Sequence, residues 1–232
     1  MRLPITLPVA LLVVLLSEPL ANTAHAEVHW RERNVMADET YLRYHPDQRY
    51  RNLGLEAYAQ QDYASALSYF TEAARYADKA SQAFIASMHW EGLGVPPDPA
   101  MAYAWIDLAS ERHTPALLAY REHYWAQLDA SQRERATAIG LDLYATYGDD
   151  VAQQRLERVM LKGRSRAAAT RSPYLYVNGH VEWYQPKFWR PRQYWAFQET
   201  LIRDAMPHAD AQGEVRVRPL EPIRDPPADD RP

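Results

Sequence analysis

The feature that most constrains this chain is an internal repeat in its middle. Residues 62–73 (DYASALSYFTEA) align, at an offset of 36, with residues 98–109 (DPAMAYAWIDLA). An aspartate opens each copy, and small alanines and large apolar residues recur at matching places. A period of about 34 to 40 residues fits two helices with their turns, and it is typical of solenoids, in which each helix pair buries its apolar face on the next. The sequence therefore predicts a mainly α fold, a short α-solenoid of helix pairs.

Local signals place the ends of these helices. Asp62 lies between two stretches with apolar residues at three- and four-residue spacing, and it is expected to cap the second of them. Gly92 and Gly94 are expected to end a helix and to take positive φ in the turn. Asp98 is expected to cap the helix that follows, with Pro99 at its first position.

Residues 81–118 resemble the Sel-1-like repeat, and residues 50–77 resemble a tetratricopeptide unit more loosely. The matching positions are Gly92, Gly94, Val95, Asp98, Ala102, Trp105 and Ala109, and the departures are Ala86, His89 and His113. Trp90, Trp105 and His89 are then interpreted as residues of the repeat core. The resemblance implies adaptor or scaffold work in protein complexes, with no cofactor, and it fixes no ligand-contacting residue.

Changes in composition and helix-breaking residues divide the chain further. We expect a signal peptide at 1–26, an irregular lead-in or short helix at 27–48, the helical-repeat domain at 49–161, a linker at 162–172, an aromatic-rich α+β segment at 173–218 and a disordered tail at 219–232. Within the repeat domain we expect a helix over 114–128, a helix to Tyr147 with a capping box at Ser131 and Glu134, and a short last helix over 151–161. Its inward residues would be Val151, Leu156, Val159 and Met160.

The aromatic-rich segment holds the candidate binding residues. Two β-rich runs flank Asn178-Gly179, which is typical of a β-hairpin. The candidates are Trp183, Trp189, Arg190, Arg192, Tyr194 and Trp195. Two interpretations stay open, because the rings either form a small core docked on the last solenoid helices or make an exposed platform that stacks on sugars or clamps a peptide.

The N-terminus predicts export. A positive Arg2, an apolar run of 14 residues from Leu3 to Leu16 and the Ala24-His25-Ala26 pattern are typical of a signal peptide cleaved after Ala26. The run is shorter than the ~20 residues of a spanning helix, although a retained anchor is the alternative. Export without a single cysteine favours a bacterial periplasm.

The remaining chemistry points to a binding protein and not to an enzyme. The net charge of −4 provides no global basic field for nucleic acid, and no histidine pair, phosphate loop or nucleophile motif indicates a metal, cofactor or catalytic site. We expect a periplasmic protein–protein interaction or scaffold protein. Peptidoglycan is an alternative partner, which would be bound through the aromatic cluster, and a carboxylate-dependent hydrolase is the least favoured alternative.

Overall fold

The computed structural model describes residues 35–169, 174–177, 180–183 and 186–205, and it describes the side chains of 35–165 and 187–203. The predicted signal peptide and the predicted disordered tail lie outside the described residues. The helices are α2 (Glu39–Leu42), α3 (Pro46–Ala59), α4 (Tyr63–Ala74), α5 (Lys79–Glu91), α6 (Pro99–Ala109), the 3-10 turn η3 (Ser110–Arg112), α7 (Pro115–Gln127), α8 (Ala130–Tyr147), α9 (Asp149–Ala169), α10 (Pro186–Trp189) and α11 (Pro191–Ala205).

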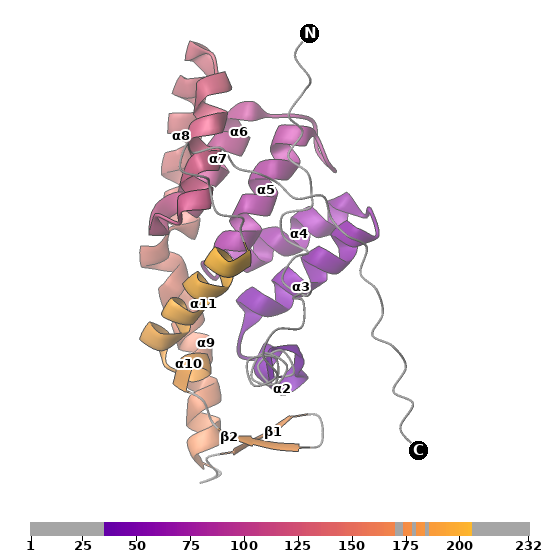
Figure 1. Ribbon diagram of the computed structural model, residues 1–232, viewed down its shortest axis with the longest axis vertical. Helices are drawn as coiled ribbons and strands as arrows, with labels where there is room; N and C mark the ends of the chain where they lie inside the picture. Colours follow the sequence, from indigo (N-terminus) through magenta and orange to yellow (C-terminus); the bar gives the residue numbers. More distant parts are fainter. Residues whose placement is uncertain (1–34, 170–173, 178–179, 184–185, 206–232) are drawn as a thin grey trace.

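The described chain is mainly helical, as predicted, and its helices pack on their neighbours in sequence (Figure 1). The most extensive contacts are between α3 and α4 and between α5 and α6. Each of these helix pairs is one copy of the 36-residue repeat. Alanines that are fully buried, including Ala66, Ala86 and Ala102, let these helices approach closely. Phe70 of α4 stacks on Phe84 of α5 with ring centroids 4.6 Å apart, which joins one pair to the next.

Aspartates begin five of the helices. Each accepts a hydrogen bond from a backbone amide in the first turn, which satisfies one of the free N–H groups at a helix start; these residues are Asp38, Asp62, Asp78, Asp98 and Asp129. The caps predicted at Asp62 and Asp98 are confirmed. The capping box predicted at Ser131 and Glu134 is wrong, because α8 begins earlier and Asp129 forms the box with Gln132.

The turn between α5 and α6 has the predicted backbone. Gly92 and Gly94 both have φ of 74°, a left-handed conformation that favours glycine. A Cβ on Gly94 would lie 2.8 Å from the backbone carbonyl carbon of Tyr63, so the turn also packs tightly on the start of α4. Trp105 of α6 is buried, and Trp90 stacks on Tyr124 of α7 at 4.0 Å. Both tryptophans therefore contribute to the repeat core.

The last long helix differs from its prediction. α9 continues to Ala169, so the linker predicted at 162–172 is wrong over 162–169. Gly163 lies inside this helix, at the point where α9 passes the rings of Tyr44 and Trp189. Leu156 and Met160 are buried as predicted, whereas Val151 is 39% exposed.

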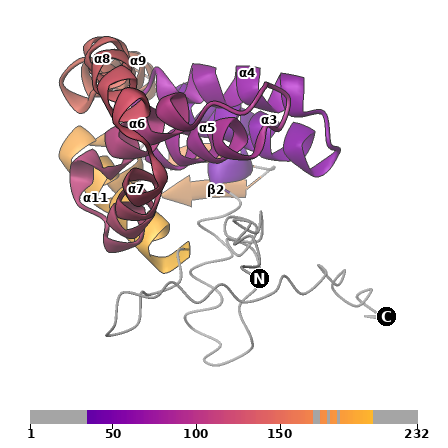
Figure 2. The same cartoon turned by 90° about the horizontal axis from the view of Figure 1, so that it is seen from above.

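The two ends of the described chain meet. The lead-in forms α2, and α3 begins at Pro46, three residues before the predicted boundary at 49. Phe188 and Trp189 of α10 pack with Val35, Tyr41 and Leu42 in one small core. Helix α11 lies on the same side of the α3–α5 helices as α7 (Figure 2).

Strands β1 (Tyr174–Val177) and β2 (His180–Trp183) pair antiparallel, with Tyr174 opposite Trp183 and Val177 opposite His180. The turn predicted at Asn178-Gly179 lies outside the described residues. No helix in the described ranges is both long enough and apolar enough to cross a membrane.

Candidate functional site

The structure places three of the four rings of the predicted aromatic site inside the protein. Trp189 is 1% exposed, Tyr194 is 0% exposed and Trp195 is 8% exposed. Tyr194 and Trp195 pack on Leu156 and Met160 of α9, as the docked-core interpretation expects. These three rings offer no open face for stacking on a sugar, and the side chain of Trp183 is not described. Arg190 and Arg192 are exposed.

A buried polar cluster lies beneath Tyr194, between α3 and α11. The Tyr194 hydroxyl donates a hydrogen bond to the Asp47 carboxylate and accepts one from Gln48 Nε2 at 2.9 Å. The same amide donates to the Tyr41 hydroxyl at 2.8 Å. Arg51 donates to Asp78 Oδ2 at 2.5 Å. Helix α11 thus docks on α3 through polar groups that are shielded from water.

The charges of this cluster do not balance, because two carboxylates face one guanidinium. Burial and the charge of Asp78 raise the pKa of Asp47 to about 7, against the hydrogen bond from Tyr194 and the charge of Arg51. Asp78 keeps the closer contact with Arg51. Asp47 is therefore the acid that takes up a proton near neutral pH.

His45 joins α2, α3 and α10. Its ring stacks on Tyr41 with centroids 3.8 Å apart, and its nitrogens face the carbonyl oxygens of Tyr41 at 2.8 Å and Phe188 at 2.6 Å. Burial lowers the pKa of His45 to about 4, although both carbonyl acceptors favour the protonated ring. This residue links α2 to α10.

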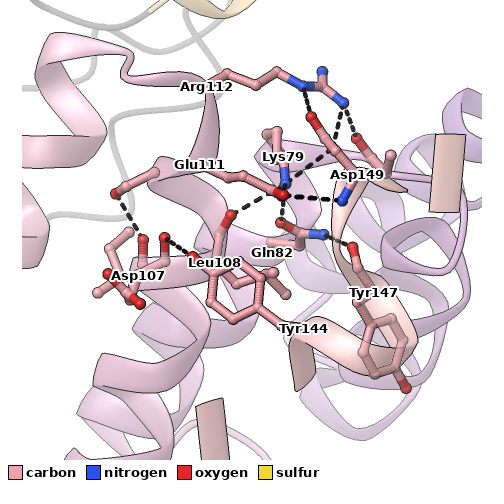
Figure 3. Close-up of polar contacts among 12 residues, drawn as sticks. Lys79, Gln82, Asp107, Leu108, Glu111, Arg112, Tyr144, Tyr147 and Asp149 are labelled. Carbon is pink, nitrogen blue, oxygen red and sulfur yellow. Dashed lines mark hydrogen bonds and ion pairs between the residues drawn. The ribbon is translucent and has the colours of Figure 1, made fainter. Parts of the chain in front are cut away.

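A second buried cluster surrounds Lys79, the first residue of α5 (Figure 3). Its Nζ atom lies 2.7 Å from Glu111 Oε2 of η3 and 3.1 Å from Asp149 Oδ1 of α9. Arg112 donates to both oxygens of Asp149, at 2.7 and 2.8 Å. Glu111 in turn accepts hydrogen bonds from the Asp149 backbone amide. The cluster joins three elements that are distant in sequence.

Glu111 and Asp149 are the kind of carboxylate pair that the hydrolase alternative requires. Burial alone would raise the pKa of Asp149, but the hydrogen bonds and charge of Arg112, with the charge of Lys79, hold it below its usual value. Both carboxylates are thus paired with cationic side chains. The arrangement is that of a structural ion-pair network.

An open groove of about 350 Å³ lies between α9 and the α10–α11 turn. It is lined by Gln154, Glu157, Arg158, Leu161, Arg164, Trp189 and Pro191. Arg158 and Arg164 are exposed, and neither guanidinium contacts a carboxylate of the described residues. Glu157 accepts a hydrogen bond from the Trp195 indole at 3.1 Å, which places its carboxylate at the inner wall.

Of the groove residues, the sequence predicted Trp189 as a binding residue, but it predicted none of those on α9. Residues 154, 157/158, 161 and 164 recur at three- and four-residue spacing on one face of α9, and this period is the signal that was available. It was missed because the helix was expected to end at Leu161.

The described residues contain no three His, Cys, Asp or Glu side chains close enough together to hold a metal ion. No protein-family model matches the chain, and neither a curated protein nor a solved structure matches it.

Proposed function

We propose that the chain is an exported periplasmic scaffold protein, built on Sel-1-like repeats, that binds other proteins. The observation that carries this proposal is the groove between α9 and α10–α11, an open surface feature with an exposed leucine and two arginines that have no partner among the described residues. Such a mixture of apolar area and unpaired arginine is typical of protein-binding surfaces.

The repeat part of the proposal is supported by positions that the Sel-1-like resemblance names. Gly92 and Gly94 have left-handed φ, Asp98 caps α6, and Trp105 is buried in the core. His113 stands where the pattern has glycine, and it also takes the left-handed conformation, with φ of 57°. The backbone at this position is therefore the one that a glycine would favour.

Site-specific crosslinking tests the function. A photo-reactive amino acid placed at Leu161, which is 49% exposed in the groove, should link to a protein partner in living cells. The control places it at Ala138, which is exposed on α8. Equal crosslinking at the two positions, or none at Leu161, counts against binding through the groove.

Export is tested separately. The protein recovered from cells should be found in the periplasmic fraction and should begin at Glu27 by mass spectrometry of its N-terminal peptide. A protein that keeps residues 1–26 and stays with the membrane would favour the retained anchor, and one in the cytoplasm would contradict export.

A further inference from the structure

The walls of the α9 groove combine cationic and apolar side chains. Along α9 the order is Arg158, Leu161 and Arg164, a cation on each side of an apolar side chain. The two arginines are six residues apart, which is roughly 9 Å along the helix axis. Pro191 of α11 forms the opposite apolar side.

The charge around the groove is more positive than that of the chain as a whole, which has a net charge of −4. Lys162 is exposed on the same helix, and Arg190 and Arg192 are exposed on either side of Pro191. The single acid in the lining, Glu157, accepts a hydrogen bond from the indole of Trp195. Unpaired cations beside apolar area complement a ligand that carries carboxylates and an apolar side chain.

We propose, resting on the protein-binding function above, that this groove binds an extended acidic segment of a partner protein, with carboxylates at Arg158 and Arg164 and an apolar side chain between them at Leu161 and Pro191. An extended chain rises about 3.3 Å per residue. Two acids that are two or three positions apart therefore span the distance between the arginines.

Other polyanions fit the groove less well. A nucleic acid or an anionic membrane presents a continuous row of phosphates, and the Glu157 carboxylate in the wall would repel them. A peptide can place an uncharged residue at that point. The groove's volume of about 350 Å³ also suits a few side chains better than a long polyanion.

The test measures fluorescence anisotropy of the purified full chain with three fluorescein-labelled peptides. Their two glutamates are separated by one, two or three leucines, and versions with glutamine are the uncharged controls. We expect at least one glutamate peptide to bind and its glutamine version to bind roughly tenfold more weakly or not at all. We expect Arg158→Gln and Arg164→Gln to weaken binding about five- to tenfold each, and added salt to weaken it further.

Arg135→Gln is the matched control, because it removes an exposed arginine of α8 that contacts Asp98; it should leave peptide binding unchanged. Equal binding of glutamate and glutamine peptides, or insensitivity to both groove variants, overturns the proposal. Tighter binding of a single-stranded DNA 12-mer or of anionic phosphatidylglycerol vesicles, sensitive to the same variants, assigns the groove to another class of ligand and also overturns it. If the peptides fail while Leu161 still crosslinks to a protein, the interaction function stands and the acidic class is wrong.

Discussion

At the scale of single residues, Asp47 makes the stability of this protein depend on pH. Its pKa is raised to about 7 in the folded chain, so the native state binds this proton more tightly than the unfolded state does. The stabilisation from Asp47 is therefore complete at acidic pH and is lost as the pH rises toward 7. His45 acts in the opposite direction, because its pKa is lowered to about 4.

Asp47→Asn isolates the first of these effects, since the amide keeps the shape of the side chain and carries no charge at any pH. We expect the free energy of unfolding of the variant, relative to the native protein, to rise by ~3 kcal/mol between pH 4.5 and pH 8. Urea denaturation at both pH values measures the difference. Asp142→Asn, on the exposed face of α8, is the control. A difference that does not change with pH would show that Asp47 is charged in the native state.

At Gly163, α9 packs tightly against Tyr44 and Trp189, which are distant from it in sequence. A Cβ there would lie 2.6 Å from Tyr44 Cγ and 2.7 Å from Trp189 Cζ3. We expect Gly163→Ala to lower the free energy of unfolding by about 1–3 kcal/mol, because the rings must move. Gly140→Ala is the matched control in α8, where a Cβ meets nothing within 4 Å; it should raise stability by up to ~1 kcal/mol. Thermal unfolding compares the two, and a stabilising Gly163→Ala would contradict the packing.

At the scale of elements, the repeat motif could be predicted from sequence and the length of α9 could not. The caps at Asp62 and Asp98 follow from local chemistry that involves only neighbouring residues. The continuation of α9 past Leu161 brings Gly163 against the rings of Tyr44 and Trp189, which are distant in sequence. A basic stretch of small residues looks like a linker in isolation, but it has no proline to prevent a helix.

Lys79 holds α5, η3 and α9 together. We expect Lys79→Met to lower the free energy of unfolding by about 3–5 kcal/mol, because it leaves Glu111 and Asp149 with Arg112 as the remaining cation of the cluster. Urea unfolding measures the loss. The control is Lys162→Met, at an exposed position on α9, which should change the free energy of unfolding by less than ~0.5 kcal/mol. A similarly small effect at Lys79 would mean that the cluster adds little to the packing of these helices.

At the scale of the whole molecule, the C-terminal helices α10 and α11 are part of the helical core and not a separate unit. Ile202 of α11 belongs to the same hydrophobic cluster as Phe70 and Trp105, and Tyr194 reaches Asp47 of α3. The sequence predicted a repeat domain that ends at 161 and an aromatic segment after a linker. It carried no signal for the contact between α2 and α10, because pairing between the two ends of a chain leaves no local pattern.

Trp195 tests whether the molecule behaves as one unit. Its indole packs on α9, donates to Glu157 and lies 4.8 Å below the guanidinium of Arg112. Trp195→Ala removes a buried indole and should cost about 3–5 kcal/mol. Because α11 covers the polar cluster of α3, we expect hydrogen exchange to accelerate in α3 as well as in α10 and α11, as measured by mass spectrometry.

The control for this last experiment is Trp125→Ala, a half-buried tryptophan of α7. Its ring packs on Tyr103 of α6 and lies under Arg133 of α8, so its effect on exchange should stay in α6, α7 and the start of α8. If Trp195→Ala accelerated exchange in α10 and α11 alone, the C-terminal segment would open without disturbing the repeats. Faster exchange in α3 would instead show that α11 stabilises the repeats. The two helices are more than 130 residues apart in sequence, and they are joined by tertiary hydrogen bonds.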